Sequence, residues 1–428
     1  MHLRYLNILR SNRDFRRLWL AQLVSEMGDW FYTLAVYDML IQTTHSGKSV
    51  SYAIMIQTLP WFFMTPLAGH VVDRFPRRHV MIVADLVRAF VVLGLMAVRS
   101  PGQIWLVYVL LGVETVFTSL FEPARNAALP NVVEEKDVLA ANALTSGTWA
   151  VALTTGAALG GIVASLLGRD FAFAINSLSY FGSAFFIQRM HLNEGHLAQA
   201  ERGGHGGGLL RGVEDLRQSL GYLKENPRVI MLMFAKTGLG LMSGALLLLT
   251  LYGERIFTLQ HALPAGILRS HGPLAVGVLY AARGFGAGFG PILGDRISQG
   301  RTSRMWLMIG AGFFLMGASY LGLSVAPVLW LGFLAVMCAH MTGSNNWVMS
   351  VTLLQTNTPD ALRGRVFAID LGFVMLTIAA TNYLIGVGFD TLHMTPRQLA
   401  AGLGFALMLP GVLWFVMLYI WKRRHPLP

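Results

Sequence analysis

Long, uninterrupted apolar runs are the feature that most limits what this 428-residue chain can fold into. A helix needs about 20 mainly apolar residues to cross the ~30 Å hydrocarbon core of a bilayer. The runs are continuous rather than alternating, which disfavours a β-barrel. Twelve stretches meet the length requirement, at residues 18–41, 50–72, 80–98, 104–122, 139–167, 170–188, 229–253, 274–295, 304–325, 328–353, 366–389 and 398–421. The sequence therefore predicts an all-α integral membrane protein with twelve transmembrane helices.

Charged residues are scarce. Asp, Glu, Lys and Arg make up 13% of the chain, about half the share found in soluble domains. This composition excludes an ordinary cytosolic enzyme, a secreted disulfide scaffold and a disordered regulator. The single cysteine, Cys338, excludes an internal disulfide and any multi-thiolate metal or iron–sulfur site. The twelve histidines show no zinc or haem spacing, and no nucleophile–base arrangement is visible. We therefore expect no enzyme activity, no metal and no cofactor.

The positive charges follow the predicted topology. If the N-terminus is cytoplasmic, 24 of the 33 Lys and Arg residues fall in cytoplasmic segments, six in outer loops and three inside spans. The positive-inside rule then places both termini in the cytoplasm. The net charge of +11 thus indicates orientation in a lipid bilayer and not a nucleic-acid partner.

The spans fall into two halves. The longest polar stretch, 189–228, separates six spans from six, and within it apolar residues recur at helical spacing over 209–223. Asp73-Arg74 after the second span is matched by Asp295-Arg296 after the eighth. This pattern is typical of two pseudo-symmetric bundles that rock about a midplane site. We expect an N-terminal six-helix bundle at 1–190, a cytoplasmic linker with an amphipathic helix at 191–226, and a C-terminal six-helix bundle at 227–428. The alternative for the linker is a simple tether.

Several motifs carry a family resemblance. They are Gly69-His-Val-Val-Asp73-Arg74-Phe-Pro-Arg77-Arg78, Leu18-Trp-Leu-Ala-Gln22-Leu-Val-Ser25-Glu-Met-Gly28-Asp29, Asp85-Leu-Val-Arg88-Ala, Phe121-Glu-Pro123-Ala-Arg125 and the segment from Leu354 to Phe367. Over nearly the whole chain the sequence resembles the major facilitator superfamily, in particular the bacterial exporter branch that holds macrolide efflux pumps and the enterobactin exporter. Pro76 replaces the usual second glycine of the first motif. The fifth span keeps the small residues of the family's antiporter motif but lacks its proline.

The resemblance implies the major facilitator fold and a multi-pass protein of the bacterial inner (plasma) membrane. It implies a secondary active transporter that exports amphiphilic, drug- or siderophore-like small molecules by alternating access, driven by proton antiport. The alternative is a lysophospholipid or lipid transporter without obligatory proton coupling. The expected partners are a small amphiphile, protons and the lipid bilayer, and we expect a monomer.

The resemblance also implies a cytoplasmic gate in which Asp73 contacts the start of the eleventh span. An acidic residue at such a place can cap a helix N-terminus or pair with Arg, at about 0.3–1 kcal/mol per exposed contact, weak enough to break in each cycle. The alternative is a plain basic loop. The pairs Asp85–Arg88 and Glu122–Arg125 are each three residues apart, so their charges can neutralise one another. The gate set is Gly69, Asp73, Arg74, Arg77, Arg78, Asp85, Arg88, Glu122, Arg125, Arg363, Arg365 and Asp370.

Ionisable residues inside the spans indicate function, because each costs about 2.5–3.5 kcal/mol on insertion scales. Glu26 and Asp29 lie three apart and share a helix face with Thr33. Two carboxylates in one water-poor place repel each other, which favours binding of a proton by one of them. Glu26, Asp29 and Glu114 are therefore the proton-coupling candidates. The alternative is a set of fixed buried ion pairs that only hold helices together.

A second set of polar residues within the spans predicts a substrate cavity. It comprises Lys236, Arg283, His340, Asn345, Asn346 and Trp347, the two cations serving as counter-ions or anion contacts. Aromatic residues that suit an amphiphile pocket are Trp30, Phe31, Trp61, Phe62, Phe63, Trp149, Tyr180 and Trp347. Core packing and interfacial anchoring are the alternative roles for these aromatic side chains.

Overall fold

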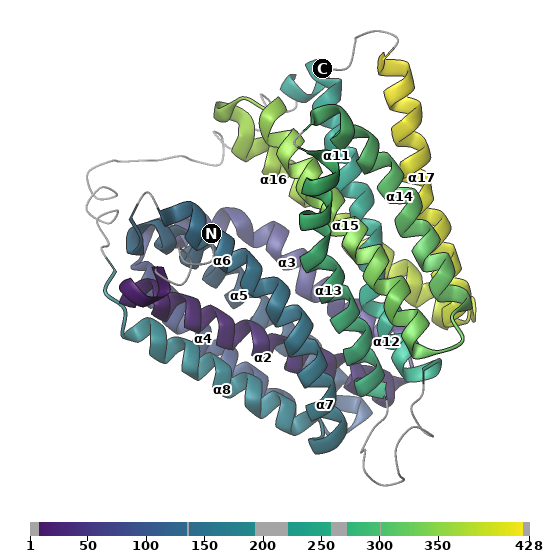
Figure 1. Cartoon of the computed structure of the whole chain (residues 1–428). Coiled ribbons are helices and arrows are strands. Elements are labelled where there is room, and N and C mark those ends of the chain that lie inside the picture. The colour runs from purple at the N-terminus through teal and green to yellow at the C-terminus, as the bar shows by residue number, and fades with distance from the viewer. Residues whose placement is uncertain (1–7, 135–136, 193–220, 258–271, 300, 423–428) are drawn as a thin grey trace. The chain divides into compact units, whose positions relative to one another are not determined.

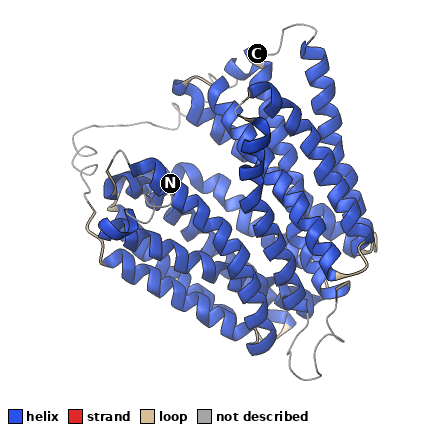
Figure 2. Cartoon of the chain, viewed as in Figure 1, coloured by secondary structure: helices blue, strands red, loops and turns tan. Residues whose placement is uncertain are grey.

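The computed structural model describes residues 8–134, 137–192, 221–257, 272–299 and 301–422 (Figure 1). Helices and the short turns between them account for all of these ranges, with no strand among them (Figure 2). Most of the predicted linker, including most of the amphipathic stretch at 209–223, lies outside the described residues. The all-α prediction is thus confirmed for the described chain.

The predicted spans coincide with observed helices. In the first half these are α2 (Arg13–Thr44), α3 (Gly47–Arg74), α4 (Arg77–Gly94), α5 (Ile104–Val132), α6 (Val138–Val151), α7 (Ala157–Leu167) and α8 (Arg169–Gln188). The predicted fifth span is formed by α6 and α7 with a π-helical turn between them, Ala152–Gly156. Such turns are rare and are found mostly as single insertions within α-helices.

The second half follows the same pattern. Its helices are α11 (Pro227–Gly240), α12 (Ala245–Arg255), α13 (Gly272–Ser298), α14 (Thr302–Val325), α15 (Leu329–Asn357), α16 (Asp360–Asp390) and α17 (Pro396–Lys422). The predicted seventh span comprises α11, α12 and the 3₁₀ turn Leu241–Gly244. Within the described ranges, eight helical stretches are long and apolar enough to cross a membrane. The chain is a multi-pass membrane protein, and the count of twelve crossings stays a prediction.

Helix ends follow local chemistry. The Asn12 side chain accepts hydrogen bonds from the backbone N–H groups of Asp14 (3.1 Å) and Phe15 (2.9 Å), which satisfies two donors at the start of α2. At the other end of α2, His45 takes a left-handed conformation (φ 53°) and its N–H returns to the carbonyl of Ile41. These two residues set the length of the helix that carries Glu26 and Asp29.

The chain divides into two compact units. Unit 1 comprises Met1–His205 and Gly253–Ala281, and unit 2 comprises Gly206–Tyr252 and Ala282–Pro428. In unit 1, α2 packs against α7 and α8, α4 lies between α5 and α8, and α3 packs on α5 (Figure 1). In unit 2, α14 packs against α15 and α17, and α11 against α15 and α16.

Small residues of the fifth span allow close helix packing, as their spacing predicts. A Cβ added to Gly160 would lie 2.9 Å from the Cα of Phe31, so α7 approaches the backbone of α2 closely. Gly156 approaches the Met27 carbonyl oxygen in the same way, at 3.2 Å. The missing motif proline therefore leaves this contact between the fifth span and α2 intact.

Candidate functional site

A polar cavity of about 870 Å³ lies in unit 1. Its walls come from α2, α3, α5 and α6, and among its residues are two of the proton-coupling candidates. The lining residues are Gln22, Glu26, Asp29, Trp30, Thr33, Trp61, Thr118, Glu122, Arg125, Asn126, Thr145 and Trp149. Its volume falls in the range of cavities that hold small organic ligands.

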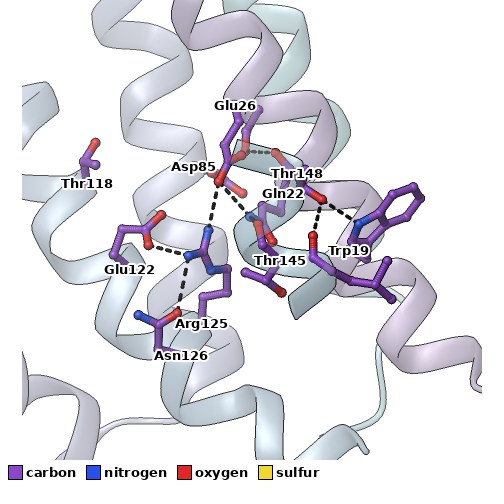
Figure 3. A network of polar contacts seen from close by, with 12 residues as sticks. Trp19, Gln22, Glu26, Asp85, Thr118, Glu122, Arg125, Asn126, Thr145 and Thr148 are labelled. Atoms are coloured by element: carbon purple, nitrogen blue, oxygen red, sulfur yellow. Dashed lines mark hydrogen bonds and ion pairs between the residues drawn. The ribbon is translucent and has the colours of Figure 1, made fainter. Parts of the chain in front are cut away.

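One wall of the cavity is an ion-pair cluster centred on Arg125 (Figure 3). The Arg125 Nη2 donates to Glu122 Oε2 at 2.6 Å, the pair expected from their spacing on α5. The Arg125 Nη1 also reaches Glu26 Oε1 on α2 at 3.4 Å. One guanidinium is thus shared between two carboxylates from different helices.

Glu26 is held in place by its neighbour on the preceding turn. The Gln22 Nε2 donates to Glu26 Oε1 (2.8 Å) and to the Thr145 carbonyl oxygen on α6 (3.0 Å). Nearby, the indole N–H of Trp19 donates to the Thr148 hydroxyl at 2.8 Å, a second tie between α2 and α6 (Figure 3). The second carboxylate oxygen of Glu26, Oε2, is buried with no hydrogen-bond partner among the described residues.

Behind the cavity wall, Tyr180 of α8 joins the two other coupling candidates. Its hydroxyl lies 2.5 Å from Asp29 Oδ1 and 3.2 Å from Glu114 Oε1. The Thr118 hydroxyl, which lines the cavity, donates to the same Glu114 oxygen at 2.7 Å. A continuous hydrogen-bonded path therefore runs from Asp29 through Tyr180 to Glu114 and returns to the cavity at Thr118.

A second guanidinium, Arg88 of α4, lies beside this path. It is 2% exposed, forms an ion pair with Asp85, and lies over the Tyr180 ring at 4.3 Å from its centroid. Its Nη1 also contacts the Thr118 hydroxyl at 3.4 Å. The structure thus joins residues that the sequence analysis divided between the gate and the coupling site.

The charges of this cluster do not balance. The carboxylates of Glu26, Asp29, Asp85, Glu114 and Glu122 outnumber the guanidiniums of Arg88 and Arg125 by five to two. Uncompensated negative charge is costly in a desolvated interior. Binding of protons or of a cationic ligand lowers that cost, and this is the chemistry that the arrangement offers.

Unit 2 contains a different arrangement around Lys236 of α11. Its ammonium forms an ion pair with Asp370 of α16, and their side chains are 3% and 0% exposed. The Nζ also lies 4.5 Å from the ring centroid of Trp347 and 5.1 Å from that of Phe367. Lys236 and Asp370, which the sequence analysis placed in separate sets, are direct partners.

The remaining residues of the predicted substrate cavity lie on α13 and α15 of unit 2. His340 Nε2 lies 3.2 Å from the Tyr320 hydroxyl, and Arg283 is close enough to act on the imidazole electrostatically. Asn346 donates to the Ile309 carbonyl at 2.9 Å. The Asn345 amide occupies the space left by Gly294, where an added Cβ would overlap the amide oxygen. The Asn346 Oδ1 is buried and has no hydrogen-bond partner among the described residues.

The predicted gate is described in part. Arg77 Nη1 donates to the Ala127 carbonyl on α5 at 2.7 Å, and Arg78 donates to the Gln188 carbonyl at the end of α8. Arg74 is exposed. The side chains of Asp73, Arg363 and Arg365 and the surroundings of Gly69 lie outside the described part of the structure, so the gate role of these residues stays a prediction.

Sequence reasoning missed the polar role of Tyr180 and the parts played by Gln22 and Thr118. Tyr180 was considered only as a lining aromatic, and 151 positions separate it from Asp29. The available signal was the polar content of the sixth span, where Asn176, Ser177, Ser179 and Ser183 are all buried. Of the predicted aromatic lining, Trp30, Trp61 and Trp149 line the cavity, whereas Phe63 is 71% exposed and the Phe62 side chain is not described.

No group of three or more His, Cys, Asp or Glu side chains that could hold a metal ion was found among the described residues. A second cavity, of about 620 Å³, lies in unit 2 between Pro227, Trp306 and Trp421. It contains none of the predicted site residues.

The chain matches a known protein family over nearly its whole length. Residues 8–422 match the family described as transmembrane secretion effector. The chain is 23% identical to the MFS-type transporter YkuC of Bacillus subtilis, over 95% of this chain and 93% of that protein. It is 24% identical to the enterobactin exporter EntS of Citrobacter koseri, over 99% and 96% of the two chains.

A solved structure shares the fold. The nucleoside transporter NupG superposes with a TM-score of 0.73 at 12% identity, covering 94% of this chain and 99% of that one. At this identity the likeness shows the fold alone. Family and relatives are transporters, which confirms the predicted major facilitator fold and the prediction that the chain is not an enzyme.

Proposed function

The chain belongs to the transmembrane secretion effectors of the major facilitator superfamily, and on this premise we propose that it is a secondary active exporter of amphiphilic small molecules. We place it in the bacterial plasma membrane and couple export to inward movement of protons. The outward direction of transport is supported by the similarity of the chain to the enterobactin exporter EntS. Proton coupling is supported by the chemistry of the cavity in unit 1.

The observation that carries the proposal is the position of the Tyr180 hydroxyl between Asp29 and Glu114. A phenol has a single proton, so it donates one hydrogen bond and accepts others. If both carboxyl groups are ionised, only one of the two contacts is a hydrogen bond and the other is a repulsion. If one carboxyl group is protonated, it donates to the Tyr180 oxygen and both contacts become favourable. The geometry therefore supports a group that holds one exchangeable proton.

This proton-holding group adjoins the space where a substrate would bind. Asp29 lines the cavity directly, and Glu114 connects to it through the Thr118 hydroxyl. A molecule that enters the cavity thus alters the surroundings of both carboxyl groups. Antiport requires such competition, because substrate and proton must occupy the protein in alternation. Arg88 beside the path stabilises the ionised form after the proton has left.

The proposal can be tested in two stages. First, an efflux-deficient bacterial host that expresses the protein is challenged with a panel of neutral, anionic and cationic amphiphilic antibiotics, and protected compounds are identified. Second, uptake of a protected compound is measured in inverted membrane vesicles with and without a pH gradient. We expect uptake against the compound's own gradient, and its loss when a protonophore collapses the pH gradient. Unchanged uptake after collapse would remove proton antiport and favour a lipid or lysophospholipid carrier.

A further inference from the structure

We propose that the cavity of unit 1 selects amphiphilic cations, and that Arg125 is a built-in cation with which the ligand competes for the same carboxylates. The inference rests on the proposed function in one respect, namely that the transported molecule enters this cavity. It goes further in naming the charge of that molecule and a residue that sets its affinity.

The first support is the charge of the lining. The ionisable residues on the cavity wall are Glu26, Asp29 and Glu122 with the single guanidinium of Arg125. The other polar lining residues, such as Gln22 and Thr33, are neutral. Even with one proton bound at Asp29, the two remaining carboxylates outnumber the one guanidinium. A cation that enters this space is attracted, whereas an anion of the same size is repelled.

The second support is the aromatic part of the lining. Trp30, Trp61 and Trp149 contribute three indole rings from α2, α3 and α6. Trp149 is 45% exposed, so its ring is accessible. Indole faces attract cations through their quadrupole, most strongly among the aromatic side chains, and they also offer apolar area to an organic body. Carboxylates combined with indoles therefore suit a ligand that is both positively charged and apolar.

The third support is the way in which Arg125 is held. Its bond to Glu122 is short, 2.6 Å, whereas its contact with Glu26 is longer and therefore weaker, 3.4 Å. The other carboxylate oxygen of Glu26, Oε2, is buried and lacks a hydrogen-bond partner among the described residues. Glu26 is thus incompletely neutralised by Arg125, and a ligand cation beside it would supply the missing charge. Arg125, tethered to the wall, occupies the place of such a cation when no ligand is bound.

The test uses two ions of nearly equal size and shape and opposite charge, tetraphenylphosphonium and tetraphenylborate. Binding of each radiolabelled ion to the purified full-length protein is measured by equilibrium dialysis against detergent alone, without any ion gradient. We expect saturable binding of tetraphenylphosphonium and at least tenfold weaker binding of tetraphenylborate, a ratio that corresponds to about 1.4 kcal/mol. Equal binding of the two ions would overturn the charge preference.

Two substitutions give opposite predictions. Glu122→Gln removes one carboxylate and is expected to weaken tetraphenylphosphonium binding about fivefold, whereas Arg125→Gln removes the competitor and is expected to strengthen it about fivefold, as for partly buried charge pairs. Arg125→Lys keeps the charge and should restore near-wild-type affinity. Glu134→Gln makes the same charge change at an exposed carboxylate outside the cavity and should change nothing.

The direction of the Arg125→Gln effect separates competition from a merely structural role. A structural role predicts weaker binding for both Arg125→Gln and Glu122→Gln, and that result would overturn the competitor assignment. If a variant fails to fold, the comparison of the two ions on the wild-type protein still decides the charge preference. Export of neutral or anionic compounds with no preference for tetraphenylphosphonium would overturn this inference while leaving the proposed exporter intact. If the predicted binding pattern were found but no gradient-driven transport, the proposed exporter function would be overturned and this inference would stand.

Discussion

The membrane-embedded charges of unit 1 and unit 2 are organised in different ways. In unit 2, Lys236 and Asp370 form a one-to-one ion pair that is almost fully buried, with Trp347 against the ammonium. In unit 1, five carboxylates share two guanidiniums in and behind the wall of a cavity, and a tyrosine hydroxyl bridges two of the acids. The first arrangement is electrically complete, and the second is not.

This difference indicates a division of labour. A balanced buried pair has little to gain from a proton or an ionic ligand, because each group already has its partner. An unbalanced cluster lowers its free energy when it binds positive charge, and releases that charge when its surroundings change. We therefore expect coupling to depend on unit 1, and the Lys236–Asp370 pair to matter mainly for the integrity of unit 2.

Loss of either carboxyl group of the bridged pair in unit 1 should have the greatest effect on transport. Asp29→Asn or Glu114→Gln removes a carboxyl group from the bridged pair, so gradient-driven uptake in inverted vesicles should fall to the level of vesicles without the protein. Binding of the substrate should persist in both variants, measured by dialysis. The matched control is the double variant Lys236→Gln/Asp370→Asn, which replaces charges in unit 2 and should retain gradient-driven uptake. Full uptake by both single variants would refute the coupling assignment.

The next effect concerns stability. Lys236→Met leaves Asp370 as an unpaired buried carboxylate, and removal of one partner of a buried ion pair costs about 3–5 kcal/mol of the free energy of unfolding. The double variant Lys236→Met/Asp370→Leu removes both charges and should recover most of this loss. Thermal unfolding in detergent, followed by tryptophan fluorescence, measures both. If the single and double variants were equally unstable, the interaction would be packing rather than charge pairing.

The smallest effect sharpens the role of the bridge. Tyr180→Phe deletes the hydroxyl and retains the ring beneath Arg88, so stability should fall by only about 1 kcal/mol, the usual net worth of one hydrogen bond. Transport should respond more clearly, with a shift in its pH dependence because Asp29 and Glu114 no longer share a donor. An unaltered pH profile would show that the hydroxyl is structural. Tyr320→Phe, which removes the hydroxyl that contacts His340 in unit 2, serves as the matched control.

Much of the architecture could be predicted from the sequence because lipid imposes a simple local rule. A backbone segment in hydrocarbon must satisfy its own hydrogen bonds, so a sufficiently long apolar run becomes a helix. The window at 170–188 corresponds to α8 at Arg169–Gln188, and the window at 104–122 lies within α5. Partners three residues apart on one helix were also predictable, and Asp85–Arg88 and Glu122–Arg125 both form.

Partners on different helices were not predictable in the same way. Lys236 and Asp370 are 134 positions apart, and Tyr180 and Asp29 are 151 apart. Nothing in the local pattern relates such residues, because their proximity depends on how helices pack side by side. The place of Arg125, a predicted gate residue, in the cavity wall could not be predicted for the same reason, since only packing brings Glu26 of α2 against it.

The amino-acid sequence alone identified this chain as a multi-pass helical membrane protein of the major facilitator superfamily, and it predicted that ionisable residues at specific positions in its spans carry its chemistry. These properties depend on hydropathy and on motifs that are contiguous along the chain. The packing of the helices had to be known before it was clear which of those ionisable groups neutralise each other and which remain in excess around a cavity. Charge balance depends on distances between helices, and side-chain packing sets those distances.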